Sequence, residues 1–152
     1  MATYRSILLN PKQIPKHWVE IEPLISKALE YSAREWNTFE ILKLALDDKI
    51  QIWLTIDANI SDSGQISTRI VCVTTTMIIT FRSNKRVLHI LTMSGNNLQQ
   101  FLSQDEALVN YAKEKGVDAI RAEGRKGWDR FTKNKYKNIY HVYERNLAME
   151  GD

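Results

Sequence analysis

The chain has 152 residues, a net charge of +3 and a hydrophobic content of 43%, which suffices for the core of a single domain over residues 1–152. No apolar run approaches the roughly 18 residues that a membrane-spanning helix needs, and the N-terminus lacks the apolar segment of a signal peptide. The lone cysteine, Cys72, excludes an internal disulfide. These features predict a protein that is not secreted by a signal peptide and has no membrane partner.

The N-terminal third reads as one strand followed by two helices. Residues 4–9 predict a short strand, and apolar residues recur three and four apart over residues 16–31, as on one face of a helix. Asn37 is placed to cap a second, shorter helix that runs to residue 46.

Three strands follow in the middle of the chain. Apolar and polar residues alternate over residues 50–56, and a long β-branched stretch covers residues 71–81 after a polar loop at 59–68. Residues 86–93 are almost continuously apolar, which is typical of a central strand covered on both faces. Three consecutive strands favour antiparallel pairing.

Helices and strands alternate in the C-terminal third. Helical spacing returns at residues 98–112 with Gly116 as its cap, and a short strand follows at 117–121. Residues 125–133 predict a short helix and residues 139–147 a last strand. The complete order predicts a mixed α/β (α+β) fold, with a mostly antiparallel sheet and helices on both faces.

Positive charge gathers near the C-terminus, where residues 121–137 hold seven cations and two carboxylates, a balance of +5. A turn with two glycines opens the predicted helix there, and we expect it to form an interaction surface. Its cations could bind phosphate or an acidic partner, or only be solvated, and its indole could anchor an interface. The surface comprises Gly124, Arg125, Lys126, Gly127, Trp128 and Arg130.

The three histidines predict no metal site. His17, His89 and His141 lack a Cys, Asp or His neighbour at the spacing of metal ligands. His89 and His141 each lie between apolar residues of a predicted strand, which favours partly buried side chains with satisfied hydrogen bonds.

The order of elements is similar to the GNAT acyltransferase fold, and the resemblance covers almost the whole chain. In that family the loop after the fourth strand binds the pyrophosphate of acetyl-CoA through the signature Gln/Arg-x-x-Gly-x-Gly/Ala. The resemblance places an acyl-CoA site at Met93, Ser94, Gly95, Asn96 and Asn97, although this segment has one glycine and no cation. Asn96 or Asn97 could instead only cap the following helix.

The same resemblance implies two candidate catalytic residues. Family members often carry a tyrosine acid on the helix after the fifth strand, where this chain has Phe131, so Tyr136 is the nearest substitute. Glu123 would lie near the acyl group and could act as a general base through water if it were buried. The alternative for Glu123 is an ion pair with Arg125 or Arg121.

Three short motifs resemble small GNAT-like proteins that tailed bacteriophages encode near their head and tail genes. They are Gln51-Ile52-Trp53-Leu54, Ala112-Lys113-Glu114-Lys115-Gly116 and Gly124-Arg125-Lys126-Gly127-Trp128. This resemblance favours a non-catalytic virion protein without a cofactor, located in the virion or the host cytoplasm. Its partners would be other virion proteins or a second copy. The alternatives are an acyl-CoA-dependent N-acetyltransferase that binds acetyl-CoA, and a basic module that contacts DNA.

Overall fold

A five-stranded sheet forms the centre of the protein in a computed structural model that describes residues 3–30, 35–94, 97–123 and 135–149. The first four strands pair antiparallel with their sequence neighbours, and the last two pair parallel. The strands lie in chain order: β1 (Thr3–Leu8), β2 (Gln51–Ile60), β3 (Ile66–Thr80), β4 (Arg86–Met93) and β5 (Ala119–Ala122). The predicted mixed class with a mostly antiparallel sheet is confirmed.

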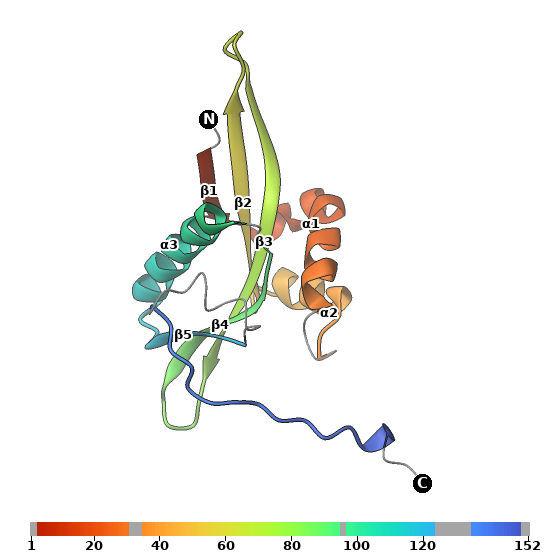
Figure 1. The fold of residues 1–152 in the computed structure, drawn as a ribbon, viewed down its shortest axis with the longest axis vertical. Coiled ribbons are helices and arrows are strands. Elements are labelled where there is room, and N and C mark those ends of the chain that lie inside the picture. The colour runs from red at the N-terminus through yellow and green to blue at the C-terminus, as the bar shows by residue number, and fades with distance from the viewer. Residues whose placement is uncertain (1–2, 31–34, 95–96, 124–134, 150–152) are drawn as a thin grey trace.

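Helices cover both faces of this sheet, as predicted (Figure 1). The helices α1 (Ile14–Leu29) and α2 (Thr38–Leu46) pack on one face, and α3 (Leu98–Lys115) packs on the other. Single turns of 3-10 helix occur at η1 (Pro11–Gln13) and η3 (Leu147–Met149). No helix in the described ranges is long and apolar enough to cross a membrane.

Each face has its own apolar core. On the α1/α2 face, Ile14, Ile21 and Ile25 repeat at helical spacing and are at most 1% exposed. On the α3 face, Trp53 packs with Leu88 and its indole meets the Tyr111 ring edge-on, with centroids 5.1 Å apart. Full burial of such side chains contributes about 1.5–3 kcal/mol each, so these two cores hold the helices against the sheet.

Capping residues set the ends of α3 where the sequence predicts them. The Asn97 Oδ1 accepts a hydrogen bond from the Gln100 amide at 2.9 Å, which confirms that Asn97 caps the helix. Gly116 ends the helix in the left-handed conformation, with φ of 66°. Asn37 caps α2 in the same way, through the Glu40 amide at 2.9 Å.

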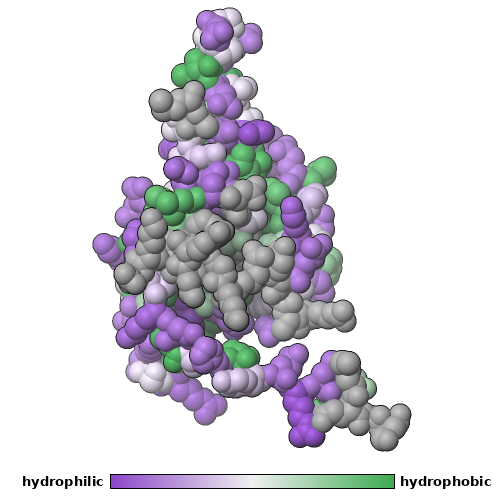
Figure 2. All heavy atoms as spheres, viewed as in Figure 1, coloured by the Kyte–Doolittle hydropathy of each residue, from purple (hydrophilic) through white to green (hydrophobic). Residues whose placement is uncertain are grey.

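The hairpin of β2 and β3 is longer than predicted, because the two strands continue through most of the expected loop. Only residues 61–65 form the turn, where the Ser61 amide donates to the Gln65 carbonyl at 2.8 Å. The hairpin therefore projects past the other strands (Figure 1), and hydrophobic side chains are visible just below its tip (Figure 2).

The prediction of a last strand at residues 139–147 is wrong. Residues 137–146 are extended but pair with no strand of the described chain, and a 3-10 turn follows. A strand needs a ladder partner, and this segment is held instead through Tyr136, whose hydroxyl donates to Asp105 of α3. The helix predicted at residues 125–133 lies outside the described residues. The predicted order of elements from β1 through β5 matches the structure.

Candidate functional site

The described pairing between β4 and β5 ends before β4 does. Their pairing stops at Ile90 opposite Ala122, whereas β4 continues to Met93. Against β3, the strand β4 carries one extra residue, Leu91, and such a bulge increases the local twist and redirects the strand. The β5-facing edge of residues 91–93 consequently has no strand partner within the described ranges.

The connection from β4 to α3 is fixed by polar contacts at Ser94. Its hydroxyl accepts from the Val73 amide at 2.8 Å and donates to the Val73 carbonyl at 3.1 Å. The Ser94 carbonyl accepts from Gln104 Nε2 at 2.9 Å. Of the predicted acyl-CoA residues, Met93 thus ends the strand, Ser94 anchors the connection, and Asn97 caps the helix, while Gly95 and Asn96 lie outside the described residues.

The first turn of α3 has backbone amides near the end of β4. An α-helix leaves its first amides without intrahelical acceptors, and Asn97 satisfies only the amide of Gln100. The amides of Leu98 and Gln99 have no acceptor among the described residues, and they lie at a helix N-terminus, which favours anions.

Two buried polar atoms next to the end of β4 lack a partner in the described part of the protein. They are Thr74 Oγ1 and Gln104 Oε1, and both side chains are at most 2% exposed. Thr74 pairs with Met93 in the sheet, and Gln104 contacts Ser94, so both atoms lie near the β4 terminus. Buried polar atoms normally have a partner, so this region is suited to a water or a ligand.

His89 is the titratable side chain of β4. Its ring is half-buried, opposite Arg121 of β5, and its buried Nδ1 has no hydrogen-bond partner in the residues described. Burial lowers the pKa of His89 below 6.5, Glu123 opposes this shift, Arg121 adds to it, and Glu35 opposes it. The imidazole is therefore neutral near pH 7 and has a nitrogen that can accept a proton.

Sequence patterns alone missed His89 as a functional candidate. We predicted a partly buried histidine with satisfied hydrogen bonds, and only the burial is correct. The sequence did carry one signal: His89 is a polar residue in a nearly continuous apolar strand, where its side chain must lose contact with water. The matching prediction for His141 is wrong, since His141 is exposed on a segment without strand structure.

Glu123 lies just after β5 and is exposed, whereas a general-base role was expected to require burial. It forms no ion pair with Arg121, and Arg125, the other predicted partner, lies outside the described residues. The Arg121 guanidinium lies instead 5.2 Å from the Phe81 ring and 5.8 Å from the Tyr140 ring. Glu123 therefore acts on His89 as a nearby negative charge.

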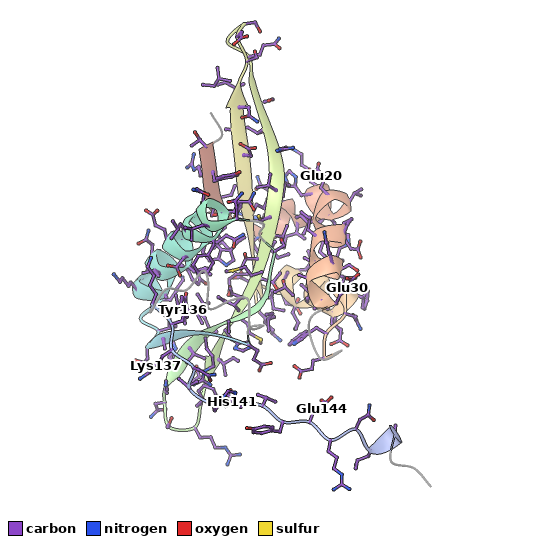
Figure 3. All side chains as sticks on the ribbon, viewed as in Figure 1. Glu20, Glu30, Tyr136, Lys137, His141 and Glu144 are labelled. Atoms are coloured by element: carbon purple, nitrogen blue, oxygen red, sulfur yellow. The ribbon has the colours of Figure 1, made fainter. Side chains whose placement is uncertain are left out.

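Tyr136 anchors the chain to α3 (Figure 3). Its hydroxyl donates to Asp105 Oδ1 at 2.7 Å, and Lys135 Nζ lies 3.8 Å from Asp105 Oδ2. Burial and then the hydrogen bond to Asp105 raise the pKa of Tyr136 well above its ordinary value of 10.0. A phenol held this way gives up its proton with difficulty, and its role as the acid stays a prediction.

The predicted interaction surface lies outside the described residues, from Gly124 through Trp128 and at Arg130. The predictions of virion partners, of a second copy and of DNA binding therefore stay predictions. Within the described ranges no three His, Cys, Asp or Glu side chains are grouped to hold a metal ion.

Comparison with solved structures shows the same fold in acetyltransferases. A predicted acetyltransferase from Clostridium acetobutylicum, solved with acetyl-CoA, matches at a TM-score of 0.62 and 19% identity, over 98% of each chain. An aminoglycoside acetyltransferase from an uncultured soil metagenomic sample matches at 0.63 and 14% identity, over 94% of this chain and 96% of that one. The ribosomal-protein-alanine N-acetyltransferase of Brucella melitensis biovar Abortus 2308 matches at 0.61 and 10% identity, over 95% and 99%. No protein-family model and no curated protein matches this sequence.

These matches correct the function predicted from the sequence. The resemblance to phage proteins favoured a non-catalytic virion role, and that prediction is wrong, because the structures that share the fold along nearly the whole chain are acetyltransferases. The fold is the GNAT fold, as the order of elements predicted.

Proposed function

We propose that the protein is a GNAT-type N-acyltransferase that transfers an acyl group from acetyl-CoA to an amine. The observation that carries this proposal is the β4 edge at residues 91–93, which has no strand partner among the described residues, with a neutral His89 on the same strand. At the start of α3, the amides of Leu98 and Gln99 have no acceptor in the described ranges. The shared fold of acetyltransferases, one of them solved with acetyl-CoA, supports the choice of donor.

The described residues fit the donor at two places. The amide-bearing arm of acyl-CoA would hydrogen-bond to the β5-facing edge of residues 91–93, as an added strand does at a sheet edge. Its diphosphate would meet the amides of Leu98 and Gln99 at the N-terminus of α3. The donor supplies an activated thioester, and the protein holds it beside an amine.

His89 is the proposed proton acceptor. The amine nitrogen attacks the thioester carbon, the new C–N bond forms, the C–S bond breaks, and the thiolate leaves. The amine must lose a proton in this step, and the neutral imidazole takes it directly or through one water. Glu123 and Glu35 stabilise the imidazolium that results, since both raise the pKa of His89.

The test combines calorimetry with acetyl-CoA and acetyl transfer to a panel of primary amines. His89→Gln is expected to leave donor affinity unchanged and to reduce kcat/KM by about 10²-fold or more, because general-base catalysis contributes about that factor. The control His141→Gln changes an exposed histidine and should match the wild type. Absence of acetyl-CoA binding at millimolar ligand would reject the proposal.

A second pair of variants tests the diphosphate site. Gln99→Pro removes one first-turn amide from α3 at a position where proline is tolerated, whereas Gln99→Ala keeps the amide. We expect acetyl-CoA to bind more weakly to the proline variant only. Equal affinities would place the diphosphate elsewhere. An origin in a tailed phage stays a prediction, which the genes beside this one would test.

A further inference from the structure

Cations gather at the turn between β3 and β4, at the end of the molecule opposite the β2–β3 hairpin (Figure 1). The last turn of α3 meets the start of β4 there, because Arg86 Nη1 donates to the Lys115 carbonyl at 3.0 Å. Lys137, beside β5, lines one hollow with Lys85 of the turn (Figure 3). We call the cationic side chains of these segments the basic end: Arg82, Lys85, Arg86, Lys113, Lys115 and Lys137.

The charge of the basic end is not neutralised within the described ranges. Five of the six side chains belong to exposed residues, Arg86 is half-buried, and none of the six forms an ion pair with a described carboxylate. The same segments carry two carboxylates, Glu114 and Asp118, and Asp118 Oδ2 already accepts from the Arg86 amide at 2.9 Å. The basic end therefore presents a net positive charge to its surroundings.

Only part of this charge serves the fold. Lys113 and Lys115 lie in the last turn of α3, where positive charge stabilises the helix C-terminus. Arg82 and Lys85 lie on the turn between two strands and have no helix end to stabilise. Like charges close together repel one another, and a polyanion relieves that repulsion, so the turn is suited to an anionic partner.

Two exposed aromatic rings border these cations. The Arg121 guanidinium lies 5.2 Å from the Phe81 ring and 5.8 Å from the Tyr140 ring. Phe81 is 37% exposed and Tyr140 is 54% exposed. Cations that follow the phosphates, with aromatic rings on which unpaired bases stack, are the features that bind single strands. A membrane surface or an acidic protein would need the charge but not the rings.

We propose that the basic end binds single-stranded nucleic acid, with its cations on the phosphates and with Phe81 and Tyr140 against the bases. This function goes beyond acyl transfer and uses another part of the molecule. The proposed diphosphate site lies at the N-terminus of α3, and the basic end includes its C-terminus. A helix of 18 residues separates its two ends by about 27 Å. The protein can therefore hold a nucleic acid and acetyl-CoA together.

Fluorescence anisotropy of the full chain with a labelled oligo(dT) of about 20 nucleotides tests the phosphate contacts. If about four cations contact phosphates, affinity should fall about 50-fold between about 50 and 200 mM salt. Arg82→Ala with Lys85→Ala should weaken binding at least about tenfold at the lower salt, because two phosphate contacts are lost. Lys16→Ala with Lys27→Ala removes two exposed cations of α1 and should match the wild type. Circular dichroism verifies that both double variants are folded.

Two variants of Tyr140 test the stacking. Tyr140→Ala should weaken binding of the oligonucleotide at least about fivefold, because stacking on one aromatic ring contributes about that factor or more. Tyr140→Phe keeps an aromatic ring and should bind like the wild type. Equal affinities of the alanine and phenylalanine variants would contradict the contact with the bases.

The remaining outcomes concern the kind of partner and the place where it binds. A dA·dT duplex, or vesicles of anionic phospholipid, that bind as tightly as the single strand overturn the proposal, because the protein then recognises charge alone. A variant of α1 that weakens binding as much as the turn variant does so too. Displacement of the oligonucleotide by about 1 mM acetyl-CoA also overturns it, since the two ligands would then share a site, whereas undiminished binding supports it.

Discussion

Thr76→Val is expected to destabilise the protein strongly, although it exchanges a hydroxyl for a methyl of nearly the same size. The Thr76 hydroxyl is fully buried on the α3 face, accepts from Trp53 Nε1 at 3.0 Å and donates to Gln51 Oε1 at 2.9 Å. Valine breaks both hydrogen bonds and leaves an indole N–H and an amide oxygen buried without partners.

The expected loss follows from those two orphaned atoms. Each buried atom without a partner costs about 1–3 kcal/mol, so the free energy of unfolding should fall by about 2–6 kcal/mol. In a domain of this size 1 kcal/mol corresponds to about 2–4 °C, so Tm should fall by roughly 4–24 °C. Thr74→Val is the matched control on the same strand, because the buried Thr74 hydroxyl has no protein partner among the described residues. Its removal therefore leaves no described group without a hydrogen bond that it had before.

Urea and thermal unfolding, followed by circular dichroism and tryptophan fluorescence, measure both variants. Coincident transitions by the two signals validate the two-state treatment. We expect Thr74→Val to be neutral or slightly stabilising. If Thr74→Val destabilises as much as Thr76→Val, the reasoning from orphaned hydrogen-bond partners is refuted.

Three further predictions concern pH and single contacts. The pKa of His89 is lower in the folded state than the ordinary 6.5, so its contribution to stability is full above pH 6.5 and is lost on acidification. In His89→Gln, the free energy of unfolding, measured with urea, should therefore depend less on pH below 6.5 than in the wild type. Tyr136→Phe removes a hydrogen bond to a carboxylate and should lower the free energy of unfolding by about 1.5–3 kcal/mol. Because the pKa of Tyr136 is raised in the folded state, this contribution should persist up to pH 10 and be lost above it. An unchanged urea midpoint in Tyr136→Phe would contradict the stabilising role of the contact between Tyr136 and Asp105. Gly116→Ala should cost about 1 kcal/mol in thermal unfolding through the positive φ alone, because no atom lies within 4 Å of the added Cβ, and Glu114→Ala, on the exposed side of α3, serves as its control.

Local patterns predicted most of the fold because each pattern has a local cause. Asn37 and Asn97 cap helices with their own side chains, so the starts of α2 and α3 are readable from the sequence. The apolar run at residues 86–93 became a strand with the same limits, because both of its faces are covered. The last strand failed because a strand depends on its neighbour, which no local pattern specifies.

The candidate site was predicted only in part. The family resemblance selected Met93, Ser94 and Asn97, which lie at the end of β4 and the start of α3, and their part in binding acyl-CoA stays a prediction. His89 was passed over because its chemistry depends on atoms distant in the chain. Burial, Glu123, Arg121 and Glu35 act together on the pKa of His89, and no spacing in the sequence brings them to one place.

By itself, the sequence determined the class of fold, the order of elements through β5 and the ends of α2 and α3, since periodicity and capping act within a few residues along the chain. Only the tertiary structure decided which strands pair, that His89 lies half-buried opposite Arg121, and that the described C-terminal segment forms no strand. Strand pairing, burial and charge act through space between residues far apart in sequence, and these interactions exist only once the sheet has formed.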